Sequence, residues 1–237
     1  MIINDCVLDV VNQYGGTMPS VVTLYDRSRY KHEGVITIGV NGQWAQGFTD
    51  AWNFQHFGTT WTRFPSHDGF NMGTGAQDFP FAIYSWAWYG NIVNRTLIGK
   101  NDTTLGRQWL VNESTRIFFY LYDESANAYI GVGETAGITQ SVFTFYAFTY
   151  DGSGADTGIM IYKNGEAVAT TPSSGGAYVA MEPSNIDLTL GCKLNNGAIE
   201  NAWSGYYGNT KVLHYLPNPG EIRAYYHSTK WLYGVPV

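Results

Sequence analysis

The sequence predicts a single all-β domain, a sandwich or barrel of antiparallel strands, with one short helix near the C-terminus. Short alternating apolar segments bounded by Gly, Asn, Asp or Pro recur along the whole chain, which is typical of that class. Aromatic residues make up 16% of the 237 residues, and the chain has 28 glycines. Aromatic side chains favour strands and glycines favour tight turns. Because no linker or internal repeat divides the chain, we expect residues 1–237 to form one domain.

The predicted strands are read from alternation of apolar and polar residues. The clearest is "FAIYSWAWYG", in which Tyr84, Trp86 and Trp88 fall on one side of an extended chain. We expect that ring-bearing face to be buried. The predicted strands cover residues 6–11, 34–40, 79–89, 117–122, 129–132, 142–150, 158–163, 166–170, 186–192 and 205–215.

Residues 149–172, "TYDGSGADTGIMIYKNGEAVATTP", contain two turn signals around a short apolar alternation. Asp151-Gly152 and Asn164-Gly165 both tolerate positive φ, so the segment is predicted to be a hairpin. The oxygens of Asp151 and Asp156 in "DGSGAD" make this turn a calcium candidate, although the twelfth position from Asp151 is Tyr162 and no EF-hand is present. Turn geometry alone also explains the motif. Asp102 in "KNDTT" is a comparable candidate.

A helix is predicted in "NPGEIRAYYHS". Asn218 suits the N-cap, Pro219 the first helical position, and Glu221 completes a capping box three residues after the cap. Ile222 and Tyr226 then share one face at a spacing of four. The helix is expected to close the domain.

Charge and hydropathy exclude two classes of partner. The formal net charge is −6, from 13 Lys and Arg against 19 Asp and Glu, and no basic stripe is present, so nucleic acid is not an expected partner. No apolar run is long enough to span a membrane. The start, "MIINDCVLDVVNQYGG", lacks the basic region of a signal peptide. Three explanations stay open: a cytoplasmic protein, release by another route such as lysis, or a leader absent from the given sequence.

Catalytic and metal motifs are sparse. Cys6 and Cys192 fit no zinc spacing, and we expect two free thiols, with a single bridge as the alternative. In "PSHDG" Ser66, His67 and Asp68 are neighbours in a loop, whereas the members of a catalytic triad converge from distant segments.

The carboxylates do not follow the pattern of a glycanase. Glycanases need two facing carboxylates, but nowhere are two acids separated by one residue. Glu113 and Glu134 could meet only from separate strands, so a glycoside hydrolase is the alternative and not the leading hypothesis.

The order of several short motifs resembles the laminin-G-like, concanavalin A-like jelly rolls. The resemblance covers roughly residues 20–228 and is carried by residues 24–36, 68–88, 97–102, 148–154, 161–169, 188–191, 203–208 and 219–226. It implies two antiparallel sheets packed face to face. It also implies that the Asn-Gly hairpin and the closing helix belong to the scaffold. Because the alternating acids of the glycanase members are missing, the resemblance implies an architecture and not a catalytic centre.

Two functional hypotheses follow. The first is a non-catalytic module that binds a glycan or cell-surface polysaccharide, with Trp52, Trp61 and Trp109 as stacking platforms unless these rings are core residues. The second is an adhesive or structural surface protein, such as a phage or virion decoration or tail component, whose partners are a virion or further copies of itself. Both place the protein outside the cell or on a virion surface. No cofactor is expected other than calcium.

Overall fold

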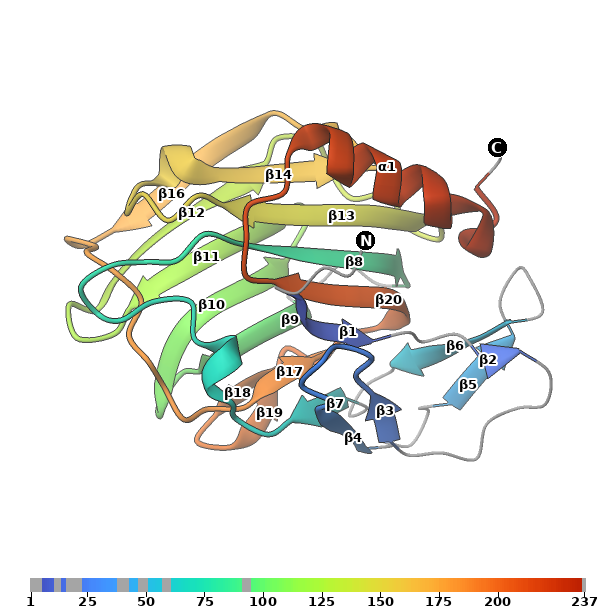
Figure 1. The fold of residues 1–237 in the computed structure, drawn as a ribbon, viewed down its shortest axis with the longest axis horizontal. Coiled ribbons are helices and arrows are strands. Elements are labelled where there is room, and N and C mark those ends of the chain that lie inside the picture. The colour runs from blue at the N-terminus through green and yellow to red at the C-terminus, as the bar shows by residue number, and fades with distance from the viewer. Residues whose placement is uncertain are drawn as a thin grey trace.

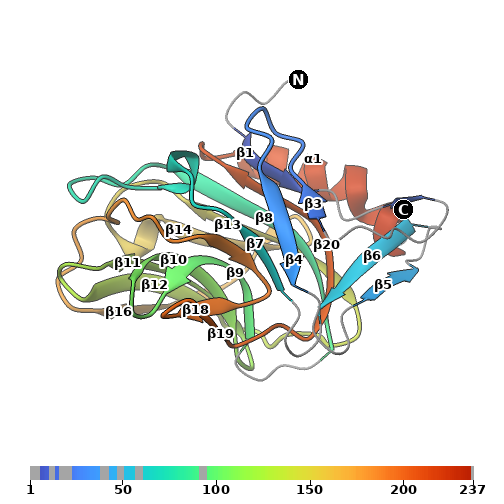
Figure 2. The same cartoon turned by 90° about the horizontal axis from the view of Figure 1, so that it is seen from below.

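The protein consists of two antiparallel β-sheets packed face to face, as the resemblance predicted (Figure 1). The computed structural model describes residues 6–10, 14–15, 23–37, 43–46, 51–56, 61–90 and 95–235. Within those ranges, the side chains of residues 14–15, 23–25, 36–37, 43–46, 51–56 and 113 lie outside the description. Figure 2 shows the two layers from below, with the strands β10, β11 and β12 in one layer and β8, β13 and β14 in the other.

We name the first layer sheet A. Its strands, in spatial order, are β15 (Glu166–Ala167), β14 (Ile159–Lys163), β13 (Phe143–Tyr150), β8 (Phe81–Tyr89), β20 (Gly205–Leu213), β6 (Ala51–His56) and β2 (Tyr14–Gly15), with β1 (Cys6–Val10) on β20 and β5 (Gln43–Gln46) on β6.

The second layer is sheet B. Its strands, in spatial order, are β16 (Thr170–Gly175), β12 (Ala128–Glu134), β11 (Ile117–Asp123), β10 (Gly106–Glu113), β9 (Arg95–Asp102), β17 (Leu188–Leu190), β7 (Trp61–Phe64), β4 (Glu33–Thr37) and β3 (Thr23–Tyr25). A hairpin of β18 (Lys193–Asn195) and β19 (Ala198–Glu200) joins sheet B at β9. The described residues also contain three short 3₁₀ segments, η1 (Asp68–Phe70), η2 (Asp156–Gly158) and η3 (Lys230–Tyr233).

The main core lies between the inner faces of the two sheets. Phe81 of sheet A contacts Trp109 and Phe119 of sheet B, with ring centroids 6.0 and 5.7 Å apart. Alternation is strict in β11, where Ile117, Phe119 and Leu121 are buried and the residues between them are half-buried. Strand alternation thus produces the buried interface that holds a two-sheet sandwich together.

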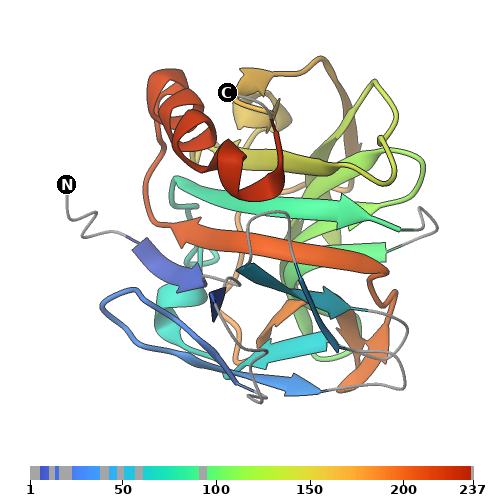
Figure 3. The same ribbon diagram turned by 90° about the vertical axis from the view of Figure 1, so that its right-hand side faces the viewer.

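The predicted helix is α1 (Pro219–Thr229), and it covers the outer face of sheet A (Figure 3). Its capping box at Asn218 and Glu221 is confirmed. Trp86 is buried there, stacked on Tyr233 with ring centroids 4.3 Å apart. Tyr84 contacts Tyr225 of α1 at 5.1 Å. The ring-bearing face of β8 is therefore buried, as predicted, but under the helix and not between the sheets. In the described ranges no helix is long and apolar enough to cross a bilayer.

The hairpin turn at Asn164-Gly165 is also confirmed. Both residues have positive φ, 53° and 85°, as a tight turn between twisted strands requires. The Asn164 side chain accepts a hydrogen bond from the amide of Phe145 on the neighbouring strand. The turn is a scaffold part that links β14 to β15.

Strands β9 and β10 were not among the predicted strands. Their sequences, "RTLIGKND" and "GRQWLVNE", bury Lys100, Asn101, Asp102 and Gln108 together with apolar residues, so no apolar-polar alternation is visible. Backbone pairing with each other and with β11 determines these strands.

The two cysteines are free and buried, as free thiols were expected. Burial raises the pKa of Cys6 to about 11 and that of Cys192 to about 12. Both side chains therefore remain protonated at neutral pH.

A long segment without regular structure, residues 176–187, is tied to the sandwich by the buried carboxylate of Asp78. This carboxylate accepts hydrogen bonds from the hydroxyls of Tyr150 and Tyr178 and from the amide of Met181, each at 2.7 Å. Burial raises the pKa of Asp78, although these three donors oppose the shift. Asp78 thus joins the start of β8, the end of β13 and the segment.

The end of the same segment is held by two fully buried polar side chains. The Lys100 ammonium donates to the carbonyls of Ser184 at 2.9 Å and Ile186 at 2.7 Å. The Gln108 amide donates to the carbonyl of Glu182. Burial lowers the pKa of Lys100 to about 8, because the charged form has lost its water.

We expect Asp78→Ala to lower the free energy of unfolding by about 3 kcal/mol, because it leaves two hydroxyls and one amide without their acceptor in a buried place. Urea denaturation measures this change. Glu33→Ala removes an exposed carboxylate and should cost less than about 0.5 kcal/mol. Equal stability of the two variants would contradict the role of Asp78.

Lys100 should make stability depend on alkaline pH. Its pKa is about 8 in the folded protein against 10.5 for a lysine side chain in water, so the unfolded chain binds more protons between these values and stability rises with pH in that window. Between pH 7.5 and 10 the unfolding free energy of the wild type should gain about 2 kcal/mol relative to Lys100→Met. A difference that does not vary with pH would contradict the lowered pKa.

Candidate functional site

The three tryptophans predicted as stacking platforms differ in their surroundings. Trp52 lies in β6, and its side chain is outside the described residues. Trp61 begins β7 and is half-buried, with the Arg63 guanidinium 5.5 Å from its ring centroid. Trp61 therefore remains available as a platform, although no described residue makes it part of a larger aromatic surface.

Trp109 requires a correction. Its side chain is fully buried between the sheets, where its ring contacts Phe81. Trp109 and Val111 face inward, because they are paired with Leu121 and Phe119, the inner residues of β11. Trp109 is a core residue, and its ring faces cannot stack on a ligand at the surface.

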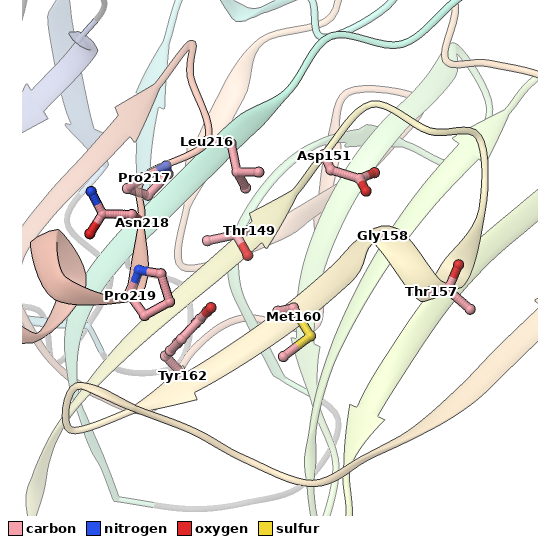
Figure 4. A pocket seen from close by; sticks show the side chains of 10 residues that line it. All are labelled: Thr149, Asp151, Thr157, Gly158, Met160, Tyr162, Leu216, Pro217, Asn218 and Pro219. Carbon is pink, nitrogen blue, oxygen red and sulfur yellow. The ribbon is translucent and has the colours of Figure 1, made fainter.

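The turn predicted to hold calcium lies beside a surface pocket. Asp151 lines a cavity of about 360 Å³ between β13, β14 and the segment that precedes α1; its lining side chains are drawn in Figure 4. One oxygen of Asp151 accepts a hydrogen bond from the amide of Ser153, and Asp156 begins η2. Within the described ranges, no three His, Cys, Asp or Glu side chains form a metal-binding group. Asp151 is the one acidic residue among those that line this pocket.

Asp102 serves a structural role in place of the calcium ligation considered from the sequence. Its carboxylate accepts four backbone N–H groups, those of Thr104, Leu105, Asn196 and Gly197. Burial alone would raise the pKa of Asp102, but these four donors outweigh it and lower the pKa. Asp102 fixes the β9–β10 turn to the β18–β19 hairpin.

The carboxylates named for a glycanase do not form an accessible pair among the described side chains. Glu134 is fully buried, and burial raises its pKa, while the Lys163 ammonium 3.7 Å away opposes the shift. The side chain of Glu113 is outside the description. A carboxylate enclosed like that of Glu134 does not reach a polysaccharide at the surface.

The outer face of sheet B carries a group of aromatic rings that we name the aromatic surface: Phe118, Tyr120, Tyr122 and Tyr129. Phe118, Tyr120 and Tyr122 are the outward positions of β11, and Tyr129 lies opposite Tyr122 on β12. All four are half-buried. Strand alternation places them together on one face.

The rings lie over glycines of the next strand. A Cβ at Gly131 would be 2.5 Å from Tyr120 Cδ1, and a Cβ at Gly133 would be 2.5 Å from Phe118 Cε1. Glycine is required at both positions, because any side chain would displace the rings. The Tyr120 ring reaches across Gly131 to form a hydrogen bond with Ser173 of β16. The glycines therefore let the rings lean along the sheet.

The rings of the aromatic surface form a continuous row. Phe118 and Tyr120 have ring centroids 5.7 Å apart and planes within 7° of each other. Tyr120 and Tyr122 are 6.2 Å apart, and Tyr122 and Tyr129 also 6.2 Å. Phe118, Tyr120 and Tyr122 thus follow one another along β11, and Tyr129 of β12 lies beside Tyr122.

A guanidinium lies over each end of this row. Arg116 lies 5.3 Å from the centroid of Phe118, and Arg107 lies 5.0 Å from that of Tyr122. Cations at this distance are attracted to the face of an aromatic ring. The two arginines therefore mark the ends of the aromatic surface.

The two outer faces of the sandwich differ in what covers them. Helix α1 packs on sheet A, and Figures 2 and 3 place it on the side away from β10, β11 and β12. No described helix covers the aromatic surface. Half-buried tyrosine rings combine an apolar face with a polar hydroxyl, which suits the apolar C–H face and hydroxyl rim of a sugar.

The sequence carries a signal for this surface, although none of its rings was among the predicted platforms. "IFFYLYD" places rings at every second position, and "YIGVGE" places Gly131 and Gly133 on the next strand with the same period. The register that pairs Tyr120 with Gly131 and Phe118 with Gly133 is visible only in the structure.

Comparison with solved structures identifies the same fold in larger toxin domains. A structure of botulinum neurotoxin type C matches with a TM-score of 0.66 and 14% identity over 96% of this chain and 52% of its own. The binding domain of botulinum neurotoxin serotype D/C matches with a TM-score of 0.67 and 16% identity over 96% of this chain and 53% of its own. The binding domain of Paraclostridial Mosquitocidal Protein 1 matches with a TM-score of 0.64 and 11% identity over 96% of this chain and 53% of its own. The chain spans about half the length of these structures.

Comparison with sequences places the chain in a family. No curated protein matches it. The family model described as the concanavalin A-like lectin/glucanases superfamily, of the laminin G type, matches residues 80–223. That range is more than half of the chain and contains β8 to β20, the aromatic surface and the start of α1. The chain therefore belongs to the concanavalin A-like lectin/glucanases superfamily.

Proposed function

We propose that this protein is a non-catalytic recognition module that binds a glycan on the aromatic surface of sheet B. The observation that carries the proposal is the row of half-buried rings that lie over Gly131 and Gly133, on the side of the sandwich opposite to α1. Rings already packed in place lose little conformational freedom on binding, which favours affinity. Burial raises the pKa of Tyr120 and of Tyr122, so both phenols keep their hydrogen-bonding proton.

The comparisons support a binding role. The binding domain of botulinum neurotoxin DC, which is similar to this chain, was solved with SialylT and with rat synaptotagmin II, and cell entry of botulinum neurotoxin type C depends on interaction with two ganglioside molecules. These proteins share 14–16% identity with the chain, so they support the fold and the class of role. That the ligand is a glycan is inferred from the chain's own aromatic rings.

Two finer hypotheses from the sequence accompany this proposal. A glycan-binding role is compatible with an extracellular or virion-surface location, and the hypothesis of an adhesive phage or virion component remains a prediction. The glycoside hydrolase alternative loses support, because Glu134, one of the two carboxylates named for it, is enclosed.

We expect Tyr120→Ala to weaken glycan binding at least about tenfold, since a central ring is a typical hot spot. Affinity electrophoresis against a panel of soluble polysaccharides measures the effect. Tyr120→Phe keeps the ring over Gly131 and should retain most of the affinity. Trp231→Ala removes an exposed ring in η3, outside the aromatic surface, and should change nothing. Binding that survives Tyr120→Ala would show that another surface is used.

Calcium at Asp151 and Asp156 remains a prediction of the sequence. A site with a dissociation constant of about 10⁻⁴ M should stabilise the protein by about 1.4 kcal/mol at 1 mM calcium, which raises the melting temperature by a few degrees. Asp151→Asn should abolish that shift. An unchanged melting temperature in calcium and in EGTA would leave the turn with a geometric role alone.

A further inference from the structure

A small cavity adjoins one end of the aromatic surface. It has a volume of about 320 Å³ and is lined by Leu105, Gly106, Arg107, Glu124, Glu182, Pro183, Ser184 and Asn185. Arg107 belongs to both features, because its guanidinium lies over the ring of Tyr122. We name this cavity the rim pocket. Its volume is at the low end of the range for small-molecule sites, which suits one sugar unit.

The wall of the rim pocket is built in advance of any ligand. Lys100 holds the carbonyl of Ser184, and Gln108 holds that of Glu182. The amide of Ser184 donates to the side-chain oxygen of Asn71, which also accepts from Gln108. Because Lys100 and Gln108 are fully buried, the wall is anchored to the interior of sheet B. A prebuilt wall reduces the entropic cost of binding.

The charges that face the rim pocket leave one carboxylate uncompensated. The Arg107 guanidinium is engaged by Glu124 at 2.6 Å and by the side-chain oxygen of Asn127 at 2.9 Å. Glu182 accepts the amide of Ser125, at 3.0 Å, and forms no ion pair with a described cation. The lining residues thus carry one arginine and two glutamates, a net charge of −1.

The charged groups behind the wall do not reverse this balance. The ammonium of Lys100 donates to the carbonyls of Ser184 and Ile186 and to the hydroxyl of Ser66, so its protons are directed to these groups and not to a ligand. Asp68 and Asp187 lie in its electrostatic surroundings, and Asp187 is itself paired with Arg63.

A further acid, Asp123, lies close to Glu182, because Ser125 donates hydrogen bonds to both carboxylates. The carboxylate of Asp123 accepts hydrogen bonds from the amides of Ala126 and Val179. Asp123 therefore adds an acid and no cation to the surroundings of Glu182.

The second cation of the aromatic surface is too distant to compensate Glu182. Arg116 directly precedes β11 and is six positions from Tyr122, which corresponds to about 20 Å along a strand. The screening length at physiological salt is about 8 Å. A ligand group in the rim pocket therefore responds to Glu182 and not to Arg116.

We propose that the rim pocket is the end subsite of the glycan site and that it takes an uncharged sugar unit in preference to one that bears a carboxylate. This inference rests on the proposed function of the aromatic surface. Hydroxyl groups can donate to Glu182 and accept from the side-chain amide of Asn185, which also lines the pocket, whereas a sugar carboxylate would face Glu182 without a free cation. Like charges in a partly enclosed site repel each other, and that repulsion excludes the acidic sugar.

The test compares one polysaccharide in two charge states. Wild-type protein is titrated by affinity electrophoresis and calorimetry with xyloglucan, galactomannan and laminarin, and with polygalacturonate, alginate and polysialic acid. Each neutral polymer that binds is then oxidised at its primary alcohols to carboxylates. We expect oxidation to weaken binding about tenfold, equivalent to about 1.4 kcal/mol. Glu182→Gln should recover most of that loss and leave binding of the neutral polymer unchanged.

Control variants separate this inference from the proposed function. Glu33→Gln, an exposed carboxylate on β4, should behave as wild type with both forms. If Tyr120→Ala abolishes binding while Glu182→Gln leaves the charge preference unchanged, the aromatic surface binds glycan and the rim pocket is not its subsite. A preference for acidic polymers that Arg116→Gln removes would also overturn the inference. If no polymer of the panel binds, the proposed function fails, and the inference fails with it.

Discussion

The buried carboxylate of Asp78 is the constraint on which the rim of the molecule depends. Residues 176–187 have no strand partners of their own, so their position follows from hydrogen bonds to groups inside the sandwich. Asp78 accepts two of them, from Tyr178 and Met181, and a further hydrogen bond from Tyr150 of β13. Polar and ionised groups are costly to leave unpaired in the interior of a protein. These hydrogen bonds therefore fix the position of residues 176–187. Residues 182–185, which directly follow Met181, form one side of the rim pocket.

The two outer faces of the sandwich use aromatic rings in opposite ways. On sheet A, Trp86 and Phe145 are covered by α1 and become a second core. On sheet B, Tyr120 and Phe118 lean over glycines and remain half-buried, and α1 lies on the other side of the sandwich. A ring that stays partly in contact with water retains part of its apolar surface for a partner. This asymmetry is the reason that the proposed binding site lies on sheet B and not on sheet A.

Membership of a superfamily that contains both lectins and glucanases does not decide between binding and catalysis, because one fold supports many functions. The decision comes from the side chains. The carboxylates of Asp78 and Asp102 accept hydrogen bonds that hold the scaffold together, and Glu134, which the sequence offered for a glycanase, is enclosed. The rings of sheet B, in contrast, carry the proposed binding site. In that proposal the charge of the rim pocket adds selectivity to the contact area that the rings supply.

Local patterns determined the elements of this protein and their order. The alternation in "FAIYSWAWYG" and "IFFYLYD", the Asn164-Gly165 turn and the capping box at Asn218 each depend on neighbours within a few residues. Strands β9 and β10 escaped prediction, because buried polar residues hide their alternation. Only the tertiary structure decided which rings are core: Trp109 and Tyr120 lie on adjacent strands, yet the first is enclosed and the second lies over Gly131. The physical reason is that register with neighbouring strands sets the face of each side chain, and those neighbours are distant in sequence.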